Sequence, residues 1–309
     1  MPPAGALQQP RRHRPSDTLR RVWTRGLARW YATNGRHELP WRATAEPWAI
    51  LVSEVMLQQT QVARVAGRWE SFLARWPTPE ACAASPLPEV LREWQGLGYP
   101  RRARALHDTA RVVAAGGWPD TEEGLRALPG IGPYTARALR LLAFGDGTVP
   151  PQDVNIARVT ARAALGLEPG QVRQAAIEEQ LAKSRPRTLN PRAFTYALFD
   201  AGALHCNAVP RCHGCPLAMG CASRSRLATA KPQPRRRSPR FRGSTRELRG
   251  AVLREMLSAH PPRTIDELQA RAGQAAEGRE PSEVRAALDA LVLERLACSM
   301  PTLSDGKSV

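Results

Sequence analysis

Apolar residues recur at spacings of three and four along most of residues 19–221, the pattern of helices that bury one face. The pattern is clearest in residues 69–76, 86–97 and 102–117, and the last of these stretches ends at a glycine pair. The strict alternation of apolar and polar residues that marks strands is almost absent. Because proline and glycine interrupt the pattern at short intervals, the sequence predicts an all-α fold of short helices in a compact bundle.

One acidic residue lies inside an apolar stretch. Residues 49–52 and 55–57 are all apolar, and Glu54 stands between them next to Ser53. An ionised carboxylate buried without a partner is so costly that it usually takes up a proton instead. The stretch therefore predicts two alternatives for Glu54: a proton-bearing acid, or the partner of an arginine across the bundle.

Residues 125–145, LRALPGIGPYTARALRLLAFG, predict two helices joined by a tight turn. Gly130 and Gly132 permit the turn, and Pro133 stands where a helix favours its first residue. The backbone N–H groups at the start of the second helix would suit a phosphate. A Gly-x-Gly turn by itself is also common as simple punctuation between helices.

The two ends of the chain differ from its middle. Residues 1–17 are rich in proline and arginine, and residues 222–243 form a basic segment interrupted by proline. Residues 244–309 predict three further helices, the second of which opens with Thr264 and Glu267 spaced as a capping box, and then a hairpin or tail. This end suits a helix-turn-helix or winged-helix unit, or a plain helical clip.

Charge indicates the kind of partner. The formal net charge is +17 over 309 residues, and Lys183, Lys231 and Lys307 are the only lysines among 45 basic residues. A coding bias would explain the preference for arginine, but it would not explain the excess of base over acid. We therefore expect a polyanion such as nucleic acid as partner. The sequence shows neither a membrane span nor a signal peptide, which predicts a cytoplasmic protein.

Four of the six cysteines lie within sixteen residues, in CNAVPRCHGCPLAMGC. Cys206, Cys212, Cys215 and Cys221 are predicted to hold a metal, because a cytoplasmic chain disfavours disulfides. A single Cys-x-x-Cys flanked by lone cysteines favours a [4Fe–4S] cluster over zinc. Two nearby histidines keep a Cys/His zinc site open as the alternative; they are His205 and His213.

Taken together, the motifs resemble those of the MutY-type adenine DNA glycosylases of the endonuclease III-like helix-hairpin-helix superfamily. The resemblance covers about residues 18–222. In chain order the motifs are LPWR at 39–42, SEVMLQQTQV at 53–62, WQGLGYPRRARALH at 94–107, LPGIGPYTA at 128–136, DVNIARV at 153–159, FDAGALHC at 199–206 and the cysteine group.

The resemblance implies removal of adenine mispaired with 8-oxoguanine or guanine by hydrolysis of its N-glycosidic bond. Glu54 matches the acid that protonates the base, and Asp153 matches the carboxylate that stays ionised near the sugar. Tyr134 stands where bifunctional relatives carry a Schiff-base lysine, which implies a monofunctional enzyme. Tyr134 would help to shield the sugar intermediate, and Asn155 would orient the catalytic water or Asp153.

The same resemblance implies DNA contacts. Gln59 and Tyr99 would enter the duplex near the mismatch when the base is flipped out, and Arg42 would line the adenine pocket. Gly130 and Gly132 would bring the hairpin backbone to a phosphate. The plainer interpretations of Gln59, Tyr99 and Arg42 are a surface amide, a core aromatic and an ion-pair partner.

The fold implied is a six-helix domain over 45–146 and a cluster domain formed by 18–44 with 147–222. A disordered tail over 1–17, a linker over 223–243 and a C-terminal helical domain over 244–309 complete the predicted chain, which we expect to be monomeric.

Two departures from the family matter. Five residues separate Cys206 from Cys212 where the family usually has six. The C-terminal end is also too short and too helical for the Nudix-like domain that recognises 8-oxoguanine in many relatives. The alternatives are a thymine- or uracil-mismatch glycosylase of the same superfamily and a non-enzymatic Fe–S regulator that binds DNA.

Overall fold

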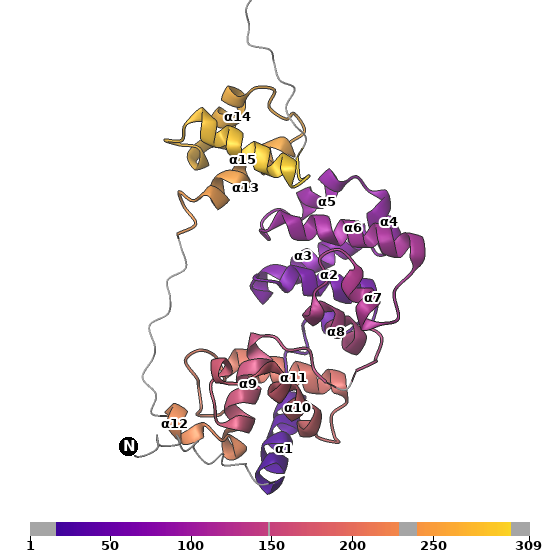
Figure 1. Cartoon of the computed structure of the whole chain (residues 1–309), viewed down its shortest axis with the longest axis vertical. Helices are drawn as coiled ribbons and strands as arrows, with labels where there is room; N and C mark the ends of the chain where they lie inside the picture. Colours follow the sequence, from indigo (N-terminus) through magenta and orange to yellow (C-terminus); the bar gives the residue numbers. More distant parts are fainter. Residues whose placement is uncertain (1–16, 148, 229–239, 298–309) are drawn as a thin grey trace, which may run out of the picture. The chain divides into compact units, whose positions relative to one another are not determined.

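The computed structural model describes residues 17–147, 149–228 and 240–297, and every helix and turn in these ranges is drawn in Figure 1. All the regular structure in them is helical, which confirms the all-α prediction. The α-helices are α1 (Asp17–Asn34), α2 (Pro47–Leu57), α3 (Val62–Arg75), α4 (Pro79–Ala84), α5 (Leu87–Glu93), α6 (Pro100–Gly116), α7 (Glu122–Ala127), α8 (Pro133–Leu142), α9 (Val154–Leu165), α10 (Gln174–Ser184), α11 (Pro191–Leu204), α12 (Arg224–Ala228), α13 (Thr245–Met256), α14 (Ile265–Ala272) and α15 (Pro281–Leu293).

Short 3₁₀ helices complete the described elements: η1 (Pro40–Arg42), η2 (Pro169–Gln171), η3 (Ala218–Gly220) and η4 (Gly273–Ala275). The tail predicted over 1–17 lies outside the described residues except for Asp17. The hairpin or tail predicted over 298–309 also lies outside them, as does the central part of the linker. No helix that the structure describes is both long and apolar enough to cross a membrane.

The described residues form two compact units. One contains the described residues of 1–38 and 140–234, and the other contains those of 39–139 and 235–309. We call them the cysteine unit and the hairpin unit, after the cysteine group and the glycine hairpin that they contain.

In the hairpin unit α2 is the most buried helix, with Trp48 to Met56 all buried. Helix α2 packs against α3 and α6, while α4 and α5 pack against α6. Aromatic rings fill the space beside it: Phe72 lies 4.8 Å from Trp76 and 6.2 Å from Trp94, measured between ring centroids. Tight packing of this kind fixes the position of any side chain carried by α2.

In the cysteine unit α11 packs against both α1 and α9, and α9 also packs against α10 (Figure 1). Asp200 on α11 is fully buried and accepts hydrogen bonds from the backbone N–H and the guanidinium of Arg36. A buried carboxylate is tolerable with such a partner, so this pair ties the chain after α1 to α11.

The C-terminal helices α13, α14 and α15 pack against one another. Thr264 caps α14 as predicted, because its hydroxyl accepts from the N–H of Glu267. The second hydrogen bond of a capping box would run from the backbone N–H of Thr264 to the Glu267 carboxylate. In the structure this carboxylate accepts from the N–H of Arg263 instead.

Candidate active site

Glu54 occupies the last turn of α2 and is only 7% exposed. The helix begins at Pro47, whose fixed φ suits the first helical position, and then carries apolar residues on every face. A helix of this composition is driven into the core, and it carries Glu54 with it. The burial expected from the apolar flanks is thus present in the structure.

The two residues predicted to enter DNA share an uncommon backbone conformation. Gln59 has φ 56° and Tyr99 has φ 50°, in the left-handed region that non-glycine residues rarely adopt. Gln59 is exposed, and Tyr99 is 48% exposed. Among the described non-glycine residues only Arg295 shares this feature. Strained conformations persist where the surrounding structure enforces them, often at functional sites.

Only one of the two hairpin glycines is required by geometry. Gly130 has φ 73°, and a Cβ atom there would lie 2.6 Å from the Cβ of Ala105 on α6. Gly132 has no such φ, and a Cβ built on it would meet nothing within 4 Å. Thr109 of α6 holds the turn by donating to the carbonyl of Pro129 over 2.7 Å. The hairpin is therefore fitted closely onto α6 at Gly130.

Two further predicted residues belong to the same unit. Tyr134 lies in the first turn of α8, two residues after Gly132, and is half-buried. Arg42 ends η1 and is also half-buried, next to the buried ring of Trp41.

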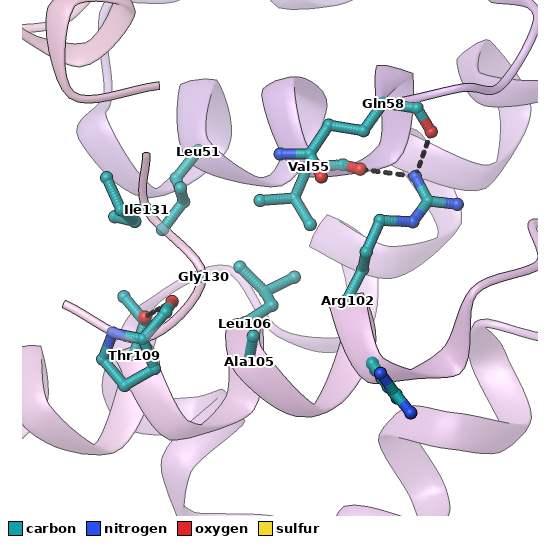
Figure 2. Close-up of a pocket in the computed structure, with 11 residues that line it drawn as sticks. Leu51, Val55, Gln58, Arg102, Ala105, Leu106, Thr109, Gly130 and Ile131 are labelled. Atoms are coloured by element: carbon teal, nitrogen blue, oxygen red, sulfur yellow. Dashed lines mark hydrogen bonds between the residues drawn. The ribbon is translucent and has the colours of Figure 1, made fainter. Parts of the chain in front are cut away.

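A cavity of about 270 Å³ lies between α2, α6 and the hairpin (Figure 2). Its lining is mostly apolar, with Leu51 and Val55 from α2, Leu106 from α6, and Ile131 from the hairpin. Of the predicted site residues, Gly130 alone lines it. The pocket that the sequence predicts for the flipped base, with Arg42 in its lining, stays a prediction.

Asp153 is the N-cap of α9 in the cysteine unit. Its Oδ1 accepts from the N–H of Asn155 at 2.9 Å and from that of Ile156 at 2.7 Å. Its Oδ2 accepts from Nδ2 of Asn155 at 2.6 Å. Asp153 is favoured at this position because its carboxylate satisfies N–H groups that lack a partner within the helix. The same contacts fix the orientation of the carboxylate.

Burial raises the pKa of Asp153 above its ordinary value of 3.8. The hydrogen bonds from Ile156 and Asn155, together with the charge of Arg158, lower the pKa and offset part of this effect. The sequence predicted an ionised Asp153. The contacts favour that form, while desolvation opposes it more strongly than the polar flanking sequence suggested.

Arg158 lies within the DVNIARV motif but is not among the predicted site residues. Its Nη2 donates to Oδ1 of Asn155 at 2.6 Å, and its Nε donates to the backbone carbonyl of Cys206. Contacts thus run without a break from Asp153 through Asn155 and Arg158 to the first cysteine of the group. The motif itself gave no role for this arginine.

The four clustered cysteines line a single hollow in the cysteine unit. Burial raises the pKa of Cys206, Cys215 and Cys221, that of Cys215 to about 11. Mutual repulsion of the thiolates raises it further, while Arg162, 4.0 Å from the sulfur of Cys206, lowers the pKa of that thiol. Clustered thiols of this kind suit a cation that holds them as thiolates.

No group of three or more His, Cys, Asp or Glu side chains among the described residues is arranged to hold a metal ion. A zinc ion draws four ligand atoms to within about 2.3 Å of one point, whereas a cubane cluster carries its cysteines farther apart. Four thiols at one hollow are a donor set that either a [4Fe–4S] cluster or a zinc ion uses, so the choice between the two stays a prediction.

Glu54 belongs to the hairpin unit and Asp153 to the cysteine unit. The pairing of these two carboxylates at one reacting base stays a prediction.

A model of the HhH-GPD superfamily of base excision DNA repair proteins matches residues 52–184. This range includes Glu54, the hairpin and Asp153. Over 255 residues the chain is 40% identical to the adenine DNA glycosylase of Mycobacterium tuberculosis, a match that covers 81% of this chain and 83% of the relative.

Solved structures give the same fold. A thermostable thymine-DNA glycosylase matches with a TM-score of 0.61 at 28% identity, covering 68% of this chain and 98% of that one. An endonuclease III–DNA covalent intermediate matches with a TM-score of 0.57 at 23% identity, covering 69% and 99%. The endonuclease III-like fold predicted from the motifs is confirmed.

Proposed function

This chain belongs to the adenine DNA glycosylases of the HhH-GPD superfamily, and we propose that it releases adenine mispaired with 8-oxoguanine or guanine without cutting the DNA backbone. The chain is a DNA N-glycosylase and binds DNA. We further propose that it acts as a monomer in the cytoplasm, on the nucleoid.

The observation that carries the mechanism is the buried carboxyl group of Glu54 in the last turn of α2. A glycosidic bond to adenine breaks readily once the base is protonated, since the leaving group then departs neutral. Glu54, 7% exposed and carried on an apolar helix, is suited to deliver that proton.

Asp153 stabilises the positive charge that develops on the sugar when the base leaves. Its carboxylate is held by hydrogen bonds from Asn155, which fix its direction. Tyr134 takes the position of the Schiff-base lysine in bifunctional relatives and carries no amine. The backbone therefore stays intact after the base is lost.

A glycosylase assay on labelled duplexes tests the proposal. The substrates are adenine opposite 8-oxoguanine, adenine opposite guanine, thymine opposite guanine, and thymine glycol. We expect release of adenine only, with strand breaks appearing after alkali or heat. Release of thymine would favour the related thymine-mismatch activity, and breaks without alkali or heat would contradict a monofunctional mechanism.

Substitutions test the catalytic roles proposed for Glu54 and Asp153. Glu54→Gln and Asp153→Asn should each lower the single-turnover rate of adenine release by at least about a thousandfold, as expected for groups that act in the transition state. Binding to mismatched duplex should change little, because each substitution keeps the side-chain size. A variant that loses binding and activity equally would argue for a structural role instead.

We propose that Cys206, Cys212, Cys215 and Cys221 hold a [4Fe–4S] cluster. The four side chains line one hollow, and Arg162 and Arg158 offset the negative charge that four thiolates bring. The cluster would act as a cross-link that holds the loop between α11 and α12, and it takes no part in the proton transfer described above.

Iron content tests the cluster independently of activity. The purified protein should carry about four irons per chain and the visible absorbance of an iron–sulfur cluster. Cys212→Ser should lose both. Cys82→Ala, at a buried cysteine outside the group, should keep both. Stoichiometric zinc in place of iron would overturn the assignment.

A further inference from the structure

Arg102 lies in the first turn of α6, close to Gln59 and Tyr99, two exposed residues with left-handed backbone. Its guanidinium donates to six oxygen atoms. They are the carbonyls of Val55, Met56, Gln58, Leu97 and Gly98 and the hydroxyl of Thr60. These acceptors belong to two separate segments, one at the end of α2 and one just before α6.

One side of the guanidinium hydrogen-bonds to the end of α2. Nη1 donates to Val55 at 2.7 Å and to Gln58 at 2.5 Å, as Figure 2 shows. The last carbonyls of a helix have no partner within it, and a cation there also complements the helix dipole. Arg102 therefore fixes the chain at Gln58, directly before Gln59.

The other side of the guanidinium hydrogen-bonds to the loop that leads to Tyr99. Nη2 donates to the carbonyls of Leu97 and Gly98, each at 3.0 Å. The indole N–H of Trp94 donates to the same Gly98 carbonyl at 3.1 Å. Tyr99 follows at once, and its ring centroid lies 5.3 Å from the guanidinium carbon of Arg102.

Thr60 closes the bridge between the two segments. Its hydroxyl accepts from Nη2 of Arg102 at 3.3 Å and lies 3.4 Å from the carbonyl oxygen of Leu97, to which it can donate. Gln59 is thus held between Gln58 and Thr60, both of which bind the same guanidinium.

Only an arginine side chain can bind the end of α2 and the loop before α6 at the same time. A planar fork presents donors in fixed directions on two sides, whereas the single ammonium of lysine is a point donor. Burial lowers the pKa of Arg102, a cost that the array of carbonyl acceptors offsets. A half-buried charge with so many backbone partners is a device for fixing loop positions rather than a surface contact with DNA.

We propose that Arg102 is a positioning residue that holds Gln59 and Tyr99 as a rigid two-pronged wedge for entering the duplex. This inference rests on the proposed function, in which the target adenine must be extruded from the stack. A preformed wedge avoids the entropy that two flexible loops would lose on binding. Arg102 thus acts on extrusion, through Gln59 and Tyr99, and does not touch the reacting base.

The test compares two substrates. In one, adenine lies opposite 8-oxoguanine in an otherwise paired duplex; in the other, it lies in a run of unpaired bases and needs little extrusion. For Arg102→Met we expect the single-turnover rate on the paired duplex to fall at least about tenfold, since small misplacements are costly. On the unpaired substrate it should fall less than about threefold.

Three further variants sharpen the test. Arg111→Met removes the same charge from an exposed position on α6 and should leave both rates near those of the parent. The single-turnover rate of Arg102→Lys on the paired duplex should lie between the rates of the parent and of Arg102→Met. Thr60→Val removes only one of the six oxygen atoms that accept from Arg102, so it should lower the rate on the paired duplex by a smaller factor and leave the rate on the unpaired substrate unchanged. If circular dichroism shows that Arg102→Met does not fold, Thr60→Val decides the question.

The outcomes separate the inference from the function on which it rests. A parent protein that releases adenine from neither substrate overturns the proposed function, and the inference with it. An active parent whose Arg102→Met and Thr60→Val variants lose rate equally on both substrates, or on neither, overturns the inference alone.

Discussion

Two opposing effects act on the carboxylate of Asp153. Burial favours the protonated form, whereas the hydrogen bonds from Asn155 and Ile156 and the charge of Arg158 favour the ionised form. The net pKa lies above 3.8. Because these effects oppose one another, the loss of a single hydrogen-bond donor should change the pKa of Asp153.

Asn155→Ala removes a donor that lowers the pKa of Asp153, so the folded-state pKa should rise further. Asp153 works in its ionised form, and activity is lost as pH falls through that pKa. The acid limb of the pH–rate profile should therefore move to higher pH. Single-turnover rates measured across acidic pH give the result.

The control for this prediction is Val154→Ala, at a neighbouring side chain that is 74% exposed and leaves the Asp153 contacts intact. It should keep the parental profile. An unchanged acid limb in Asn155→Ala would mean that another group controls it.

Some residues could be found from the sequence and others could not. Glu54 was identifiable because an acid within an apolar stretch is a local anomaly. Arg102 and Arg158 are embedded in an arginine-rich chain, and most of their partners are backbone carbonyls. Since every residue offers such a carbonyl, the sequence does not show what these two arginines bind, although both lie within the family motifs at 94–107 and 153–159.

The hairpin between α7 and α8 contains two glycines that look equivalent in the sequence but have different roles in the structure. Both permit a turn in principle. Only Gly130 needs its missing side chain, because its φ is 73° and α6 lies directly against it. Gly132 is exposed and has open space around it.

Gly130→Ala should lower the free energy of unfolding by about 2 to 5 kcal/mol, the sum of the cost of a left-handed alanine and the cost of its overlap with Ala105. Gly132→Ala, the matched control, should change it by less than about 1 kcal/mol. Denaturant unfolding measures both. Equal effects would show that the hairpin is not seated on α6 as described.

At the scale of the whole molecule, the net charge of +17 predicts binding to DNA with a strong dependence on salt. Phosphate contacts release counterions, so the logarithm of the binding constant falls linearly with that of salt concentration. The basic run of Arg235, Arg236 and Arg237 in the linker is the densest local contribution to this charge.

Replacing these three arginines with glutamine should make the salt slope for duplex binding shallower by up to about 2.7, at about 0.9 per phosphate contact. Replacing them with lysine keeps the charge and should keep the slope. Fluorescence anisotropy at several salt concentrations measures it. A glutamine variant with the parental slope would exclude the linker from the DNA contact.

Periodicity, composition and motif order are local properties of the chain, so they were sufficient to predict the helical class, the buried acid, the cysteine group and the family. Three features became visible only in the folded protein: which hairpin glycine cannot carry a side chain, which arginine joins the loops at Gln59 and Tyr99, and how strongly burial acts on Asp153. Each of these depends on atoms that residues distant in sequence bring into contact, and such contacts leave no local pattern to read.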